Sequence, residues 1–237
     1  MSEFDHPVVA ALYDTDDDRS DLDLYLDLAR EVDARSVLDV GCGTGTFALL
    51  LSARGHDVVG VEPAAAMLDL ARAKPGAEAV TWVHGTVDDV PELQADLATM
   101  TANTAQVFTT DDAWAGLLAE IRGRLRTEGR VAFETRVPAR RAWEAWTRER
   151  TYERLDVPGL GEVESWVDLL SVEPPLVTFS STTVLSDGET VAAESTLRFR
   201  ERDEVEESLA RAGFGRVEVR DAPDRPGLEW VFVATAV

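Results

Sequence analysis

Residues 37–45 read VLDVGCGTG, and this stretch decides the fold. Its apolar start predicts a short buried strand at residues 36–40, and the stretch TFALLLSARG that follows predicts a helix from near Thr46 to Gly55. Three glycines at alternate positions separate the strand from the helix. Because glycine has no side chain, a ligand can approach this backbone closely and meet the unpaired N–H groups that begin the helix. The stretch therefore predicts a ligand-binding turn at the carboxyl edge of a sheet.

The same order of strand and helix continues along the chain. DVVGVEP at residues 57–63 predicts a second buried strand, and AAAMLDLARA predicts the helix after it. Further elements are strands at 80–83, 95–101, 129–136, 216–221 and 228–236 and helices at 20–33, 111–126 and 201–212. Such alternation predicts an α/β fold, in which a doubly wound and mostly parallel sheet is covered by helices on both faces.

A different pattern interrupts this alternation. After an expected helix near residues 138–150, the chain becomes rich in Val, Thr, Ser and aromatic residues. This composition predicts antiparallel strands at 151–156, 162–171, 175–185 and 190–199, and Asp187-Gly188 is a hairpin signal between the last two. The sequence therefore predicts an antiparallel β insertion within one α/β domain. Its residues do not decide between a roof over a substrate cleft and a dimer contact.

An acid at the end of the second predicted strand adds a ligand group. Glu62 lies 21 residues beyond Gly41, a spacing that brings a carboxylate to the two hydroxyls of a ribose. Dinucleotide and nucleoside cofactors both use that geometry. A dinucleotide fingerprint G-x-G-x-x-G needs a third glycine where Thr46 stands, whereas the third glycine here is Gly45. An NAD(P)-dependent oxidoreductase using the same turn stays an alternative.

At this point the sequence resembles the class I S-adenosylmethionine-dependent methyltransferases. The similarity rests on VLDVGCGTG, on VVGVEP with its terminal acid and on AAAMLDLARA, and it continues through HGTVDDVP at 84–91 and ADLATMTANTAQVF at 95–108. The resemblance implies a Rossmann-like sheet of seven strands with an antiparallel final strand. It also implies S-adenosylmethionine as cofactor, S-adenosylhomocysteine as product, and methyl transfer to an unidentified small-molecule acceptor by direct in-line displacement. A protein that binds S-adenosylmethionine without catalysis is a further alternative.

The resemblance also divides the chain, which it treats as a single methyltransferase domain over residues 1–237. Residues 1–35 would form a helical cap and residues 36–137 the cofactor-binding core. Residues 138–200 would form the insertion, and residues 201–237 the last helix and strand hairpin.

Most of the binding residues that the resemblance implies follow the first two strands. Around the glycine turn, the methionine and ribose part of the cofactor would be lined by Gly41, Cys42, Gly43 and Gly45, with Asp39 bracing the turn. Glu62 would bind the ribose hydroxyls, and Pro63 or Met67 would cover the adenine face.

The rest of the implied site comes from other segments. Thr86, Val87 and Asp88 would edge the adenine. The family often has an aspartate where Thr86 stands, so the contact to the adenine amino group passes to Asp88 or to main chain. Ala102 and Asn103 would flank the methionine moiety and the transferring methyl group, and Tyr13 would reach the amino-acid end of the cofactor.

Other residues carry two interpretations from sequence alone. Glu134 and Arg136 end a strand near the predicted mouth, where a structural ion pair and substrate contact are equally consistent. Trp143, Trp146 and Trp166 suit either an acceptor pocket or the core. No residue can be named as a catalytic base.

Composition excludes several classes of partner. The 237 residues carry 23 Lys and Arg against 45 Asp and Glu, a net charge of −22 that would repel nucleic acid and anionic lipid. A single Cys42 cannot form an internal disulfide, and the acidic run from Asp14 to Asp18 is interpreted as a solvated face, so no metal site is predicted. No apolar run approaches a membrane span, and the N-terminus is acidic. We expect a cytoplasmic monomer or homodimer acting on a small molecule.

Overall fold

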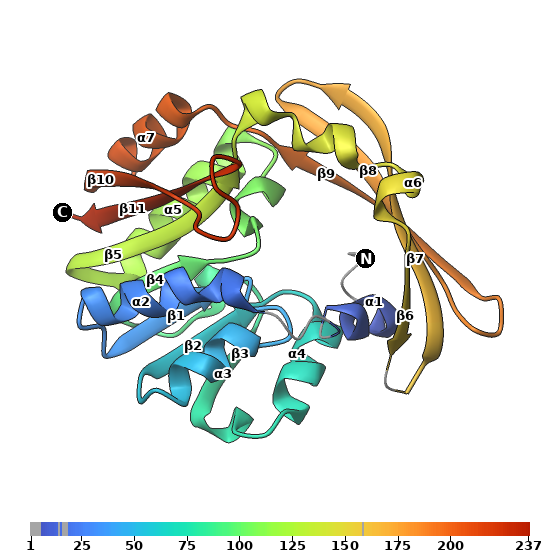
Figure 1. Cartoon of the computed structure of the whole chain (residues 1–237). Coiled ribbons are helices and arrows are strands. Elements are labelled where there is room, and N and C mark those ends of the chain that lie inside the picture. Colours follow the sequence, from blue (N-terminus) through green and yellow to red (C-terminus); the bar gives the residue numbers. More distant parts are fainter. Residues whose placement is uncertain (1–5, 14, 16–18, 158) are drawn as a thin grey trace.

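The computed structural model describes residues 6–13, 15, 19–157 and 159–237. Among these residues, seven strands form a central sheet in the order β10-β11-β5-β4-β1-β2-β3 (Figure 1). Its strands are β1 (Ser36–Val40), β2 (Asp57–Glu62), β3 (Val80–His84), β4 (Ala95–Met100), β5 (Leu125–Arg136), β10 (Phe214–Asp221) and β11 (Glu229–Ala236). Parallel pairing joins β3, β2, β1, β4 and β5, whereas β11 runs antiparallel to both β5 and β10. The predicted fold class, with its antiparallel final strand, is confirmed.

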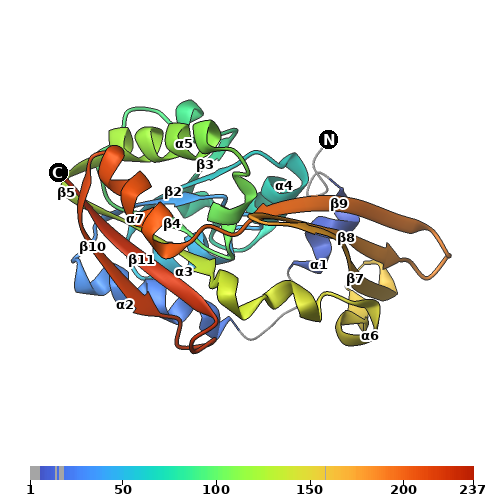
Figure 2. The ribbon, with the colours of Figure 1, turned by 90° about the horizontal axis from the view of Figure 1, so that it is seen from above.

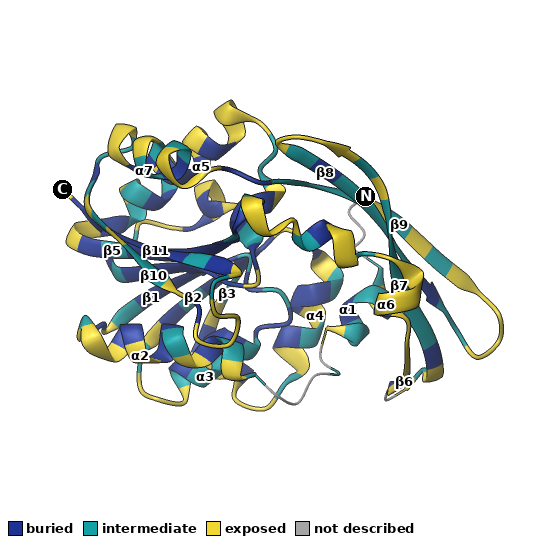
Figure 3. Cartoon of the chain, turned by 45° about the horizontal axis from the view of Figure 1, so that its top comes forward, coloured by how far each residue is buried: buried dark blue, intermediate teal, exposed yellow. Residues whose placement is uncertain are grey.

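Helices cover both faces of this sheet because neighbouring strand residues point to opposite sides. Leu38, Phe133 and Phe232 pack with α5 (Asp111–Arg124) and α7 (Arg202–Arg211). The residue before each of them, Val37, Ala132 and Val231, packs on the other face with α2 (Asp23–Glu31) and α3 (Thr46–Ser52). Figure 2 shows α5 and α2 on opposite sides of the strands. The central strands are therefore buried on both faces, as Figure 3 shows.

The shorter elements surround this core. A 3-10 turn, η2 (Ser20–Leu22), leads into α2. After β2, α4 (Ala65–Ala73) packs against α1 (Pro7–Leu12) through Met67 and Ala10. Single turns at η3 (Ala77–Ala79), η4 (Val87–Asp89) and η5 (Thr104–Val107) connect the remaining strands. No helix in the described part of the chain is both long and apolar enough to span a membrane.

The predicted insertion is a separate antiparallel sheet of four strands. Its order is β6-β7-β8-β9, with β6 (Glu153–Val157), β7 (Gly161–Glu173), β8 (Leu176–Val184) and β9 (Thr190–Arg198). The expected hairpin lies between β8 and β9, where Gly188 has a φ of 87°. The sheet extends away from the central strands (Figure 1), and a bond from Gln106 Nε2 to the Arg198 carbonyl oxygen, 3.2 Å long, anchors β9 to η5.

The expected helix near residues 138–150 was wrong. The structure has two 3-10 turns there, η6 (Pro138–Arg140) and η7 (Ala142–Ala145), and one helical turn, α6 (Arg148–Thr151). Arg141, at a φ of 49°, reverses the backbone between the first two turns. Trp143 and Trp146 then reach the insertion, with their rings 4.6 Å from Phe199 and 4.9 Å from Phe179 between centroids. Burial of these two aromatic side chains against β8 and the end of β9 outweighs the local helical pattern.

Candidate functional site

A cavity of about 480 Å³ opens at the carboxyl ends of β1, β2 and β4. This volume lies in the range of small-molecule and cofactor sites. Ten of the fourteen predicted binding residues line it: Tyr13, Gly41, Cys42, Gly43, Glu62, Pro63, Met67, Thr86, Val87 and Ala102. The other four, Asp39, Gly45, Asp88 and Asn103, lie outside the lining. The parallel register of the strands brings these distant segments to one edge of the sheet.

The three glycines of the turn have different surroundings. All have positive φ angles, of 68° at Gly41, 55° at Gly43 and 78° at Gly45. A Cβ atom on Gly45 would lie 2.5 Å from the Trp82 ring and 2.8 Å from the Cβ of Ala71, so this glycine allows α3 to pack closely. At Gly43 the same atom would meet nothing within 4 Å. Gly43 is therefore where the turn exposes bare backbone to the cavity.

Glu62 joins the end of β2 to the glycine turn. Its Oε2 accepts a hydrogen bond from the Gly43 N–H at 3.1 Å, and its Oε1 accepts one from the Ala64 N–H at 2.9 Å. The side chain is buried, yet it lines the cavity. The sequence predicts a ligand role for Glu62, and the structure adds a role in holding the turn.

Asp39 lies beneath the turn and is almost fully buried. Its Oδ1 accepts a hydrogen bond from the Thr99 hydroxyl at 3.2 Å, which joins β1 to β4, and Oδ2 has no hydrogen-bond partner among the described residues. Burial raises the pKa of Asp39 from 3.8 to about 7, and the nearby charge of Glu62 adds to the rise. Burial also raises the pKa of the Cys42 thiol, so this cysteine is not poised as a thiolate nucleophile.

The segment after β3 forms a capped turn at the cavity edge. Asp89 Oδ2 accepts a hydrogen bond from the Thr86 N–H at 2.8 Å, and Val87 is buried and lines the cavity. Asp88 is exposed and does not line the cavity. Sequence reasoning missed Asp89, although the spacing of Thr86 and Asp89 is that of an N-terminal capping pair.

The segment after β4 has a strained backbone. Ala102 and Asn103 adopt left-handed φ angles of 55° and 60°, which are unfavourable for residues with a Cβ atom. The Asn103 N–H donates to Glu134 Oε1 at 2.5 Å, and its side-chain amide donates to Glu229 Oε1 at 3.0 Å. These buried carboxyl groups hold the strained segment. Ala102 lines the large cavity, whereas Asn103 lines a second, smaller cavity beside it.

Glu134 and Arg136 do not form a simple ion pair with each other. The Arg136 guanidinium donates to Gln106 Oε1 at 3.0 Å and lies 4.0 Å from Glu229, while Glu134 bonds to the Asn103 N–H. Burial raises the pKa of Glu134 from 4.5 to about 8; the Asn103 bond opposes the rise and the charge of Glu229 adds to it.

Other cavity residues had no sequence signal of their own. Most of them have apolar or small side chains, and two are charged. They include Phe47, Thr104, Phe108, Leu117, Arg19 and Glu120. Thr104 packs above Gly41, where a Cβ atom would lie 2.8 Å from its methyl group. The helical periods of α3 and α5 place Phe47 and Leu117 on the buried faces of these helices. The packing alone determines which residues of those faces reach the cavity. Asp14 and Asp16 to Asp18 of the acidic run lie outside the described residues.

The comparison with protein families agrees with this geometry. The family model of the methyltransferase domain matches residues 37–129, which run from β1 into β5 and include both the glycine turn and Glu62. The chain therefore contains a segment similar to this methyltransferase domain, and its fold is that of solved S-adenosylmethionine-dependent methyltransferases.

Curated relatives match nearly half of the chain. It is 32% identical over 111 residues to a cypemycin N-terminal methyltransferase of Streptomyces sp, covering 46% of this chain and 45% of that protein. It is 33% identical over 121 residues to an uncharacterised methyltransferase of Mycobacterium tuberculosis, covering 49% of this chain and 45% of that protein. The matches thus span less than half of each relative's length.

Solved structures are similar over nearly the whole chain. A S-adenosylmethionine-dependent methyltransferase from Clostridium acetobutylicum is similar with a TM-score of 0.75 and 15% identity, covering 97% of this chain and 96% of that one. The amino pentose methyltransferase CalS10 from Micromonospora echinaspora is similar with a TM-score of 0.73 and 22% identity, covering 97% of both chains. These similarities include the second sheet, since they extend well beyond residues 37–129.

The different surroundings of two glycines predict different costs of substitution. Gly43→Ala and Gly45→Ala each introduce a left-handed alanine, which costs about 1–2 kcal/mol. Gly45→Ala also forces a methyl group against Trp82 and Ala71, which adds about 1–3 kcal/mol. Urea unfolding of both variants should give the lower free energy of unfolding for Gly45→Ala. Equal losses would contradict the assigned packing role.

The raised pKa of Asp39 predicts a dependence of stability on pH. Between pH 3.8 and about 7 the folded protein retains a proton on Asp39 that the unfolded chain releases. The contribution of this carboxyl to the free energy of unfolding is therefore full below about pH 4 and falls as pH rises through 7. Asp39→Asn, which resembles the protonated form, should reduce this fall in urea denaturation series at several pH values. An identical fall in wild type and variant would show that Asp39 does not titrate in this range.

Proposed function

We propose that the large cavity binds S-adenosylmethionine and that the protein transfers its methyl group to a small-molecule acceptor. One observation carries the proposal. The exposed Gly43 backbone, the Glu62 carboxylate and the Thr86–Val87 turn line a single cavity of about 480 Å³ at the carboxyl edge of the sheet. They come from three separate strand ends, so no single motif explains their convergence.

The residues fit an adenosyl cofactor by their chemistry. The open space at Gly43 admits the ribose and methionine part against the backbone, and the Glu62 carboxylate accepts hydrogen bonds from ribose hydroxyls. Pro63, Met67 and Val87 offer apolar surface to an adenine ring. Ala102 lies at the end of β4, where the reacting end of the cofactor is expected. When bound, S-adenosylmethionine supplies an electrophilic methyl group on a sulfonium.

The protein's share of catalysis is alignment and exclusion of water. Direct displacement of a methyl group requires the acceptor atom, the methyl carbon and the sulfur to be in line. Holding two reactants in this arrangement lowers the activation barrier by about 7–11 kcal/mol. The strained Ala102–Asn103 segment provides a rigid wall for this purpose, since Glu134 and Glu229 hold it in place. Phe47, Phe108 and Leu117 limit the access of water.

Known similar proteins support a small-molecule acceptor. CalS10 is an amino pentose methyltransferase, and the similar KedS8, with a TM-score of 0.74 and 18% identity over 92% of this chain and 87% of that one, is a sugar N-methyltransferase. The alternatives are an oxidoreductase using NAD(P) and a protein that binds S-adenosylmethionine without catalysis. Transfer of labelled methyl groups into a metabolite extract separates catalysis from binding alone.

The proposal predicts the effect of replacing Glu62. Glu62→Ala should weaken S-adenosylhomocysteine binding by about tenfold or more, because a charged hydrogen bond contributes about 1.5–3 kcal/mol. Isothermal titration calorimetry measures this affinity. Glu92→Ala, an exposed glutamate before β4, is the matched control and should bind as wild type does.

Thermal unfolding of both variants checks that the turn survives the change at Glu62, since this residue also holds the Gly43 N–H. Unchanged affinity in a folded Glu62→Ala variant would remove Glu62 from the cofactor site. Binding of NAD with no response to S-adenosylhomocysteine would refute the proposed function.

A further inference from the structure

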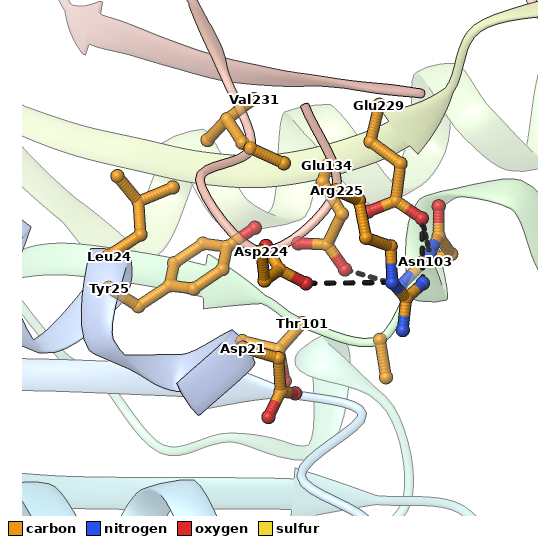
Figure 4. A pocket seen from close by; sticks show the side chains of 12 residues that line it. Asp21, Leu24, Tyr25, Thr101, Asn103, Glu134, Asp224, Arg225, Glu229 and Val231 are labelled. Atoms are coloured by element: carbon orange, nitrogen blue, oxygen red, sulfur yellow. Dashed lines mark hydrogen bonds and ion pairs between the residues drawn. The ribbon is translucent and has the colours of Figure 1, made fainter. Parts of the chain in front are cut away.

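A second cavity, which we call the polar pocket, adjoins the cofactor cavity. It has a volume of about 30 Å³ and lies between α2, the end of β4, the end of β5 and the segment before β11 (Figure 4). Thr101 and Ala102 line both cavities, so the two meet at the end of β4. Since a single water needs about 10–15 Å³, the polar pocket holds one or two groups of that size.

Three polar atoms in the lining of the polar pocket have no hydrogen-bond partner within the described chain. They are Tyr25 Oη, Asn103 Oδ1 and Glu134 Oε2. Their residues are only 3%, 4% and 6% exposed. Each unsatisfied buried group costs about 1–3 kcal/mol, so three around one cavity indicate a bound water or ligand. Asn103 Oδ1 accepts only, and ionised Glu134 does as well, so that ligand must carry hydrogen-bond donors.

The charges around the polar pocket leave one of its acids, Glu134, without an ion-pair partner among the described residues. Four carboxyl groups and one guanidinium line it, from Asp21, Glu134, Asp224, Glu229 and Arg225. The Arg225 guanidinium lies 2.9 Å from Glu229 and 3.5 Å from Asp224. Asp21 pairs with Arg19 at 3.0 Å. Arg136, outside the lining, lies 4.0 Å from Glu229. No three His, Cys, Asp or Glu side chains of the described residues are arranged to hold a metal ion. A cation with N–H donors, an ammonium group, satisfies both requirements.

We propose that the polar pocket binds the ammonium group of an amine methyl acceptor and that Glu134 Oε2 accepts a proton from it. This inference rests on the proposed function, because the amine must face the methyl group of a cofactor held in the neighbouring cavity. In the step, one N–H bond breaks and one O–H bond forms at Oε2. The electron pair stays on nitrogen, which becomes the neutral nucleophile, and the proton leaves Glu134 for solvent after the product departs.

Glu134 is held in the orientation that this role needs. Its Oε1 accepts the Asn103 N–H at 2.5 Å, whereas its Oε2 is buried without a hydrogen-bond partner in a side chain that lines the polar pocket. Because burial raises its pKa to about 8, the carboxyl is mostly protonated at pH 7. A cation binds the ionised form, so its affinity should increase as pH rises through about 8, and bound cation should lower the pKa of Glu134.

Carbon-13 NMR of side-chain-labelled glutamate tests the proposal without requiring turnover. The full chain is saturated with S-adenosylhomocysteine and titrated with methylammonium chloride, and the Glu134 carboxyl resonance is assigned by its loss in Glu134→Gln. Tetramethylammonium chloride, which has the same charge but no N–H donor, is the control ligand. Methylammonium should shift the resonance saturably and tetramethylammonium should not. Its affinity should rise about tenfold from pH 7 to pH 9 if a group of pKa near 8 must ionise.

The same substitution at two glutamates of β5 provides a matched comparison of methylammonium binding. Glu134→Gln keeps the Oε1 acceptor for Asn103, so it should fold, yet it should bind methylammonium about tenfold more weakly and lose the pH dependence. Glu128→Gln, an exposed position of β5, should bind as wild type does. Binding by the Glu134→Gln variant is followed by the amide resonances of Asn103 and the aromatic resonances of Tyr25.

Calorimetry on the same samples separates this inference from the proposed function. Failure to bind S-adenosylhomocysteine refutes the proposed function, and with it this inference. Normal binding of S-adenosylhomocysteine without a saturable methylammonium shift refutes the ammonium site alone. If S-adenosylhomocysteine itself shifts the Glu134 resonance and excludes methylammonium, the polar pocket serves the cofactor's amino-acid end, and the assignment to the acceptor is overturned.

Discussion

The site depends on one hydrogen bond between neighbouring strand ends, which the Gly43 N–H of the turn after β1 donates to the Glu62 carboxylate at the end of β2. Parallel pairing of β1 with β2 sets these strand ends side by side. The bond can form only because the turn follows a left-handed path, which its three glycines permit. The same carboxylate then orders the turn and lines the cavity, so the proposed cofactor site is largely preformed.

A second set of buried acids organises the neighbouring strand ends. Glu134 and Glu229, from β5 and β11, hold Asn103 in a left-handed conformation at the end of β4. The antiparallel final strand thereby contributes to the site although β5 and β4 separate it from β1. Through Ala102 this strained segment faces the proposed cofactor, and through Asn103 it faces the polar pocket. Adjacent residues of one strained segment therefore line the two cavities.

Local patterns explain what could be predicted from sequence. The fold was predicted from local signals, namely the glycine turn, the acid at Glu62 and the alternation of strands and helices. The structure confirms the α/β fold that these signals predict. The role of Gly45 in packing against Trp82 and the placement of Asn103 behind the cavity depend on long-range contacts that no spacing encodes. The expected helix near 138–150 failed for a related reason, because Trp143 and Trp146 gain more by burial against the insertion than by continuing a helix.

A crystal structure of the protein with bound S-adenosylhomocysteine tests the central claim most directly. We predict that the adenosyl group lies in the large cavity, with its ribose hydroxyls within hydrogen-bond distance of the Glu62 carboxylate and its sugar against the Gly43 backbone. A ligand bound elsewhere, or a ribose without contact to Glu62, would contradict it.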